Sequence, residues 1–168
     1  MLKKRVKLII VFIILFILQF DFFPYFSFRN TVPDLLSILV VFYALYVKKH
    51  RLLLFALCIG LCKDIFSSNY FGVNIISLWV AAHALFFLSR KFPQDLLVIQ
   101  VGLVGIYVLL VQSIILIIMF LFDMTFSAWQ CFVPETVPSV FYTMICAFFV
   151  VPALKAIMKD SLRQYNLF

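Results

Sequence analysis

Long apolar runs alternate with short polar segments along this 168-residue chain. Six of the runs are typical of membrane-spanning helices. They cover approximately residues 8–23, 33–47, 52–66, 73–88, 96–122 and 137–154. The second and third runs would be about 20 Å long as helices, against a hydrocarbon core of about 30 Å, so they must borrow flanking residues or thin the bilayer. The pattern predicts one all-α transmembrane domain, a helix bundle of about six spans.

Composition agrees with a membrane protein and excludes a soluble globule. Of the 168 residues, 66% are hydrophobic and only 12% are charged, which leaves too few polar side chains to cover a water-exposed surface. The first run is followed by Pro24 and several aromatic residues in place of a small-residue cleavage site. We therefore expect it to be retained as the first transmembrane helix.

The distribution of basic residues predicts an orientation. Twelve of the 14 Lys and Arg residues fall in four groups that six spans place on one side of the membrane. The groups are Lys3, Lys4, Arg5 and Lys7; Lys48, Lys49 and Arg51; Arg90 and Lys91; and Lys155, Lys159 and Arg163. Because positive loops stay in the cytoplasm, we expect both termini there, in a multi-pass protein of the cytoplasmic (inner) membrane. The basic tail, residues 155–168, is either an interfacial helix for anionic lipid or a cytoplasmic partner, or a topological signal alone.

Catalytic and metal-binding motifs are missing from the sequence. The four cysteines form no C-x-x-C pair, and we find no H-E-x-x-H, P-loop, G-x-G-x-x-G or nucleophile with a histidine partner. We therefore predict a protein that is not an enzyme and has no metal, no cofactor and no nucleic-acid partner.

Two carboxylates are the most informative polar residues. Asp34 and Asp64 each lie 15 residues from Lys49, so an antiparallel helical hairpin places them at about the same depth. For Asp34 we favour a role at a helix start, with the Thr31 hydroxyl as the N-cap. Asp64 falls near a helix C-terminus, where the dipole disfavours negative charge, so either Lys63, in an intramembrane ion pair, or a polar pocket must stabilise it.

Three roles are open for such a carboxylate pair: a proton relay, an ion pathway or a clamp between helices. The other acidic residues lie in or beside the predicted loops, so a relay or pathway lacks further groups through the membrane. We favour the clamp.

The same region carries a family resemblance. The segment has Pro33-Asp34-Leu35-Leu36, a short span, a basic turn and then Gly60-Leu61-Cys62-Lys63-Asp64-Ile65-Phe66-Ser67 before Gly72. This order resembles the pattern P-D-L-L followed by G-L-x-x-D-x-x-S and a glycine in the bacterial rod shape-determining protein MreD family. Lys63 departs from the apolar residues usual at its position. The resemblance marks Pro33, Asp34, Gly60, Asp64, Ser67 and Gly72 as structural or interaction residues.

The resemblance implies a non-enzymatic inner-membrane subunit of the cell-elongation complex that makes peptidoglycan. Its expected partners are the transmembrane helix of MreC, the MreB filament, the peptidoglycan synthases (RodA and its penicillin-binding protein) and membrane lipids. The family fold is also similar to the substrate-binding subunit of energy-coupling-factor transporters. The alternative is therefore a vitamin-binding subunit with an outward pocket near Asp34, Asp64 and Asn74, where convergent polar groups would be needed.

Overall fold

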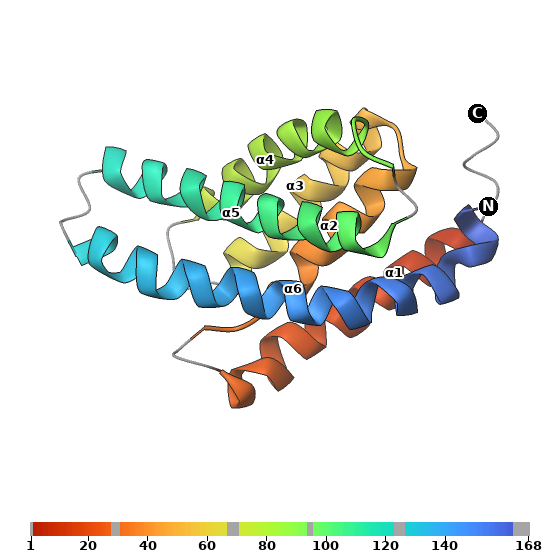
Figure 1. Ribbon diagram of the computed structural model, residues 1–168, viewed down its shortest axis with the longest axis horizontal. Helices are drawn as coiled ribbons and strands as arrows, with labels where there is room; N and C mark the ends of the chain where they lie inside the picture. The colour runs from red at the N-terminus through yellow and green to blue at the C-terminus, as the bar shows by residue number, and fades with distance from the viewer. Residues whose placement is uncertain (1, 28–30, 67–70, 94–95, 123–126, 163–168) are drawn as a thin grey trace.

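In the computed structural model of the chain, the described residues form six α-helices packed as a bundle (Figure 1). The structure describes residues 2–27, 31–66, 71–93, 96–122 and 127–162, with side chains except at 2–8, 26, 127–135 and 158–162. The helices are α1 (Leu2–Ile17), α2 (Leu35–Tyr46), α3 (Lys49–Phe66), α4 (Val73–Ser89), α5 (Leu97–Leu121) and α6 (Ser127–Leu162). A π-helical turn (Leu18–Phe22) and a 3₁₀ turn (Phe23–Phe26) follow α1. The predicted all-α class is confirmed.

The shortest of the six helices lies at the centre of the bundle. α2 packs against α1, α3, α4, α5 and α6, and ten of its 12 residues are buried. Its sequence is apolar on every side except at Ser37, which is what burial on all faces requires. At 1.5 Å per residue, α2 is about 18 Å long and shorter than the hydrocarbon core.

Two helical hairpins, α3–α4 and α5–α6, pack around α2, and each contains a glycine at a close contact. A Cβ on Gly60 of α3 would lie 2.6 Å from Cα of Ile75 in α4, so only glycine allows this approach of the two backbones. A Cβ on Gly105 of α5 would lie 2.7 Å from the Met144 sulfur of α6. Gly60 therefore sets the spacing of α3 and α4, whereas the Met144 side chain could move away from a Cβ at Gly105.

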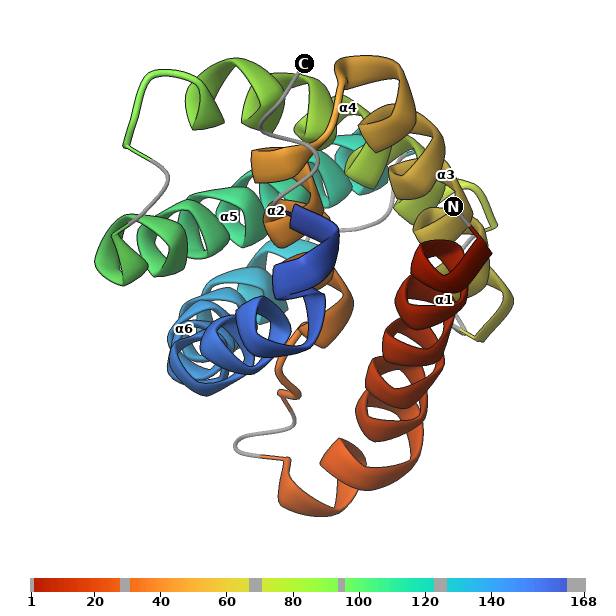
Figure 2. The ribbon, with the colours of Figure 1, turned by 90° about the vertical axis from the view of Figure 1, so that its right-hand side faces the viewer.

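α1 lies at the edge of the bundle (Figure 2). Among the described side chains, Val11 and Leu15 of α1 and Gln19 of the π-helical turn after it are buried, and their spacing of four residues makes a single inward stripe. The Phe16 and Phe20 rings contact the Phe66 ring of α3, with centroids 4.9 and 5.4 Å away. The opposite face is apolar and exposed, as a lipid-facing surface would be.

Helix lengths bear on the predicted spans. Among the described residues, two stretches are both long and apolar enough to cross a membrane: Leu97–Leu121, and Thr136–Ile157 within α6. Ile9–Tyr25, Leu35–Tyr46 and Val73–Ser89 are apolar but shorter. α6 begins at Ser127, well before the predicted span at 137, because a helix can continue past the apolar segment that the hydropathy pattern detects. The number of spans and their orientation stay predictions.

Candidate functional site

The α2 N-terminus is capped by Asp34. Its carboxylate accepts hydrogen bonds from the Ser37 backbone N–H (3.1 Å) and the Ser37 hydroxyl (2.6 Å). Asp34 therefore lies at a helix start and caps it, as expected from the sequence. The expected N-cap at Thr31 is wrong: residues 32–34 have no regular structure, and the helix begins at Leu35.

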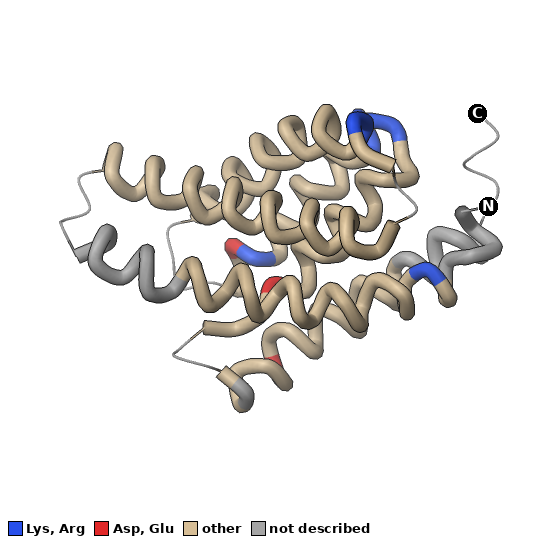
Figure 3. The backbone as a smooth tube through the Cα atoms, in the orientation of Figure 1, with Lys and Arg blue, Asp and Glu red and all other residues tan. Residues whose placement is uncertain are grey.

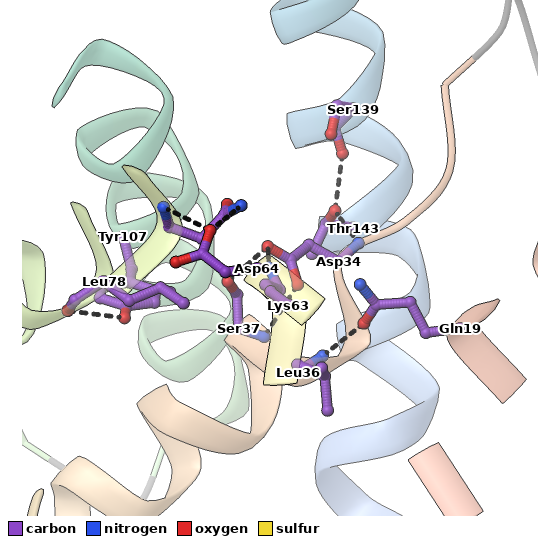
Figure 4. A network of polar contacts seen from close by, with 11 residues as sticks. Gln19, Asp34, Leu36, Ser37, Lys63, Asp64, Leu78, Tyr107, Ser139 and Thr143 are labelled. Carbon is purple, nitrogen blue, oxygen red and sulfur yellow. Dashed lines mark hydrogen bonds and ion pairs between the residues drawn. The ribbon is translucent and has the colours of Figure 1, made fainter. Parts of the chain in front are cut away.

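Two other helices satisfy further backbone donors at this end of α2 (Figure 4). Gln19, in the π-helical turn after α1, accepts from the Leu36 N–H at 2.9 Å. The Thr143 hydroxyl of α6 accepts from the Asp34 N–H at 2.9 Å and donates to the Ser139 carbonyl at 2.7 Å. A helix start inside an apolar bundle has no water to bind its free N–H groups, so side chains must replace it.

Lys63 of α3 forms an ion pair with Asp34, with Nζ 2.5 Å from Oδ2. The two side chains are 11% and 12% exposed, so the pair is largely shielded from its surroundings. Of the two candidates for the partner of Asp64, Lys63 is therefore the wrong one: it reaches across to α2 instead. The ion pair ties α3 to the first turn of α2.

Asp64 caps the next helix along the chain. Its carboxylate accepts from the backbone N–H groups of Gly72 (2.9 Å), Asn74 (3.0 Å) and Ile75 (3.1 Å), and from the Asn74 side-chain amide (2.9 Å). The polar surroundings expected for Asp64 are thus the start of α4. A charge unfavourable at the end of α3 becomes favourable at the positive end of α4. Gly72, at φ 99°, supplies the left-handed turn between them.

The structure therefore brings most of the predicted site residues together. Asp34 and Lys63 lie at the start of α2, Asp64 and Gly72 lie at the start of α4, and Pro33 is buried immediately before α2. Gly60 lies one turn before Asp64 at the close contact of α3 and α4. Ser67 lies outside the described residues.

Three members of the network were missed from sequence: Gln19, Ser37 and Thr143. Gln19 is an isolated polar residue in an otherwise apolar run, and this isolation could have marked it as a hydrogen-bonding residue. Nothing in the local sequence marks Thr143, because its partner Asp34 is 109 residues away.

The arrangement is suited to joining helices rather than to chemistry. Each carboxylate is bound by several donors and faces the positive end of a helix, so neither is presented to a substrate. Within the described ranges, no three His, Cys, Asp or Glu side chains gather as a metal site would need. The network joins the π-helical turn after α1 to α2, α3, α4 and α6.

A sequence model of the family described as rod shape-determining protein MreD matches residues 2–156. The chain belongs to the MreD family. MreD proteins are membrane proteins that determine rod shape, and they are not a known enzyme family. No curated protein and no solved structure matches the chain significantly. The segment that carried the resemblance to MreD, residues 33–72, is also the one that supplies both capping carboxylates and Lys63.

Proposed function

We propose that this MreD-family chain is a non-enzymatic, multi-pass subunit of the bacterial inner membrane that serves the cell-elongation complex. Its role is to bind MreC and to position that protein near the MreB filament and the peptidoglycan synthases, RodA and its penicillin-binding protein. The observation that carries the proposal is the family match over residues 2–156. The bundle has six spans with both termini in the cytoplasm.

A scaffold needs a rigid body and an open surface for a partner helix. The polar network supports rigidity, because hydrogen bonds and an ion pair join α2, α3, α4, α6 and the π-helical turn after α1. An open apolar groove between α5 and α6 supplies a surface for a partner helix. It is lined by Val101, Phe141, Met144, Ile145, Phe148 and Phe149. Gly102 lies beside it, and a Cβ there would meet no atom within 4 Å.

We assign the transmembrane helix of MreC to this groove. Helices associate in membranes through close packing at small residues and through contact with apolar side chains, and the groove offers both. Phe148 and Phe149 are 52% and 71% exposed and supply much of its free surface.

The vitamin-binding alternative is not favoured. A vitamin site needs convergent polar groups that a ligand can reach. The carboxylates expected to line it, Asp34 and Asp64, are instead bound by Lys63 and by helix-start donors. The α5–α6 groove carries apolar side chains only.

Co-purification tests the proposal. The tagged chain is extracted from its native membranes in mild detergent, and the proteins that stay bound are identified. We expect MreC to be recovered, and the variant Phe148→Ala/Phe149→Ala to recover several-fold less of it. The control Ile13→Ala/Ile14→Ala removes side chains of similar exposure from α1 and should recover as much MreC as the wild type. Recovery of an ATPase-driven transporter module, or of a bound vitamin without cell-wall proteins, would contradict the proposal.

A further inference from the structure

Basic residues from two separate turns gather at one end of the bundle (Figure 3). Lys48, Lys49 and Arg51 come from the α2–α3 turn and the first turn of α3, and Arg90 and Lys91 follow α4. We call these five residues the basic surface. All are exposed except Lys49, which is half-buried. The described acidic residues at the other ends of α2 and α3, Asp34 and Asp64, are too far away to neutralise them.

Specific contacts fix the two turns against each other. The Arg90 guanidinium donates to the Val47 carbonyl at 3.1 Å and lies over the Phe86 ring, 5.1 Å from its centroid. Lys49 Nζ lies 4.7 Å from the centroid of the Phe87 ring on α4. The charges of both turns therefore form one surface of fixed geometry, with Lys48, Arg51 and Lys91 exposed around these contacts.

Among the described residues, this concentration of positive charge is unfavourable. Lys49 and Arg51 lie in the first turn of α3, which has no acidic residue, so their charges oppose the positive end of the helix dipole. Like charges held close together also repel one another. A bound anion would relieve both effects.

Apolar side chains lie one turn further along the same helices. Leu54 is 61% exposed and follows Arg51 by three residues, which places the two on one face of α3. Phe87, directly below the Lys49 ammonium, is 59% exposed. A ligand matched to this surface has an anionic head and an apolar chain. An acidic segment of a soluble protein would match only the charged part.

We propose that the basic surface is a binding site for an anionic phospholipid. The phosphate lies among Lys48, Arg51 and Lys91, and an acyl chain lies along Leu54 and Phe87. The ends of apolar helices meet the headgroup layer, where each basic residue adds to the attraction for anionic lipid. The inference rests on the membrane arrangement in the proposed function but goes beyond the assignment of MreC as partner.

Lipid binding to the purified full-length chain tests the inference. Native mass spectrometry counts the phosphatidylglycerol and phosphatidylcholine molecules retained from detergent micelles that contain both. We expect phosphatidylglycerol to be preferred, and the variant Lys48→Gln/Arg51→Gln/Lys91→Gln to bind it roughly 100-fold more weakly. Lys49 and Arg90 stay in place in this variant because they hold the two turns together.

The matched control is Lys3→Gln/Lys4→Gln/Lys7→Gln, which removes the same charge near the start of the sequence and should keep the preference. Equal losses of phosphatidylglycerol binding in both variants would mean diffuse attraction to a positive protein and would overturn the site. Unchanged binding in both variants would overturn it as well. Displacement of the lipid by glycerol phosphate at equal concentration would show a site for a free anion and would also overturn the inference.

The MreC recovery assay separates this inference from the proposed function. If the chain recovers MreC but shows no preference for phosphatidylglycerol, the lipid site falls and the proposed function stands. If the lipid preference depends on the basic surface but MreC is not recovered, the lipid site stands and the proposed function falls.

Discussion

Charged side chains are tolerated inside this bundle because each one contacts a group of opposite sign. Asp34 faces Lys63 and the positive end of α2, and Asp64 faces the positive end of α4. Lys63, in the last turn of α3, faces the Asp34 carboxylate and lies at the negative end of the α3 dipole. Its full opposite charge comes from Asp34, so loss of that carboxylate would leave the ammonium with only the partial charge of the helix end.

The burial of the Lys63 charge beside Asp34 predicts the effect of neutralising Asp34. Asp34→Asn keeps a side-chain oxygen for the Ser37 N–H but leaves the Lys63 charge buried without its carboxylate. We expect a loss of about 3 kcal/mol in the free energy of unfolding. Equilibrium unfolding in mixed micelles with sodium dodecyl sulfate, followed by circular dichroism, measures it.

The double variant Asp34→Asn/Lys63→Met is the control for that experiment, since it removes the stranded charge as well. It should be more stable than Asp34→Asn alone. Equal stability of Asp34→Asn and the wild type would show that the ion pair contributes nothing.

At this scale the sequence predicted some roles and not others. The position of Asp34 was predictable because a carboxylate beside proline at the start of an apolar run has a local meaning. The partners of Asp64 were not, because they lie eight to 11 residues ahead, across a turn whose geometry depends on Gly72. Judged against α3 alone, Asp64 looks misplaced; judged against α4, it is a cap.

At the scale of elements, α2 is a short helix that begins inside the bundle. Thr31 and Pro33, in the segment before it, are buried, and Pro33 has no N–H group to satisfy. The next N–H group, that of Asp34, is bound by Thr143 of α6. Irregular backbone at membrane depth is tolerated when protein groups satisfy it. The predicted second span would therefore consist of this helix of about 18 Å and the irregular segment before it.

The α3–α4 hairpin allows a test of close helix packing. Gly60→Ala would place a methyl group 2.6 Å from the Ile75 backbone, where no side-chain movement relieves the overlap. We expect a loss of about 1–3 kcal/mol in the free energy of unfolding, measured in the same mixed micelles.

Gly102→Ala is the matched control, because it is the same change in a helix but its methyl group enters open space. Its stability should lie within about 0.5 kcal/mol of the wild type. If the two variants unfolded alike, the close approach of α3 to α4 would not be the cause of the loss.

At the scale of the whole molecule, the ends of the bundle differ in charge. The basic surface lies where α2 ends and α3 begins, and Asp34 and Asp64 lie at the other ends of these helices (Figure 3). The six helices were predictable because apolar runs and basic clusters alternate regularly along the sequence. The central place of α2 was not, because hydropathy alone does not separate a helix buried by protein from one that faces lipid.

The orientation of the bundle can be measured directly. We expect tags inserted near Lys49 and Arg90 to report the cytoplasm and a tag near Ala128 to report the exterior, since twelve basic residues then lie inside. Fusions to alkaline phosphatase and to green fluorescent protein at each position distinguish the two sides. A cytoplasmic signal at Ala128 would contradict the six-span arrangement, because the α5–α6 hairpin would not cross the bilayer. In that case the basic surface and the far end of the hairpin would lie on the same side of the membrane. The lengths of α5 and α6 disfavour that arrangement. Each helix contains an apolar stretch of at least 22 residues, about 33 Å, which is enough to span the hydrocarbon core.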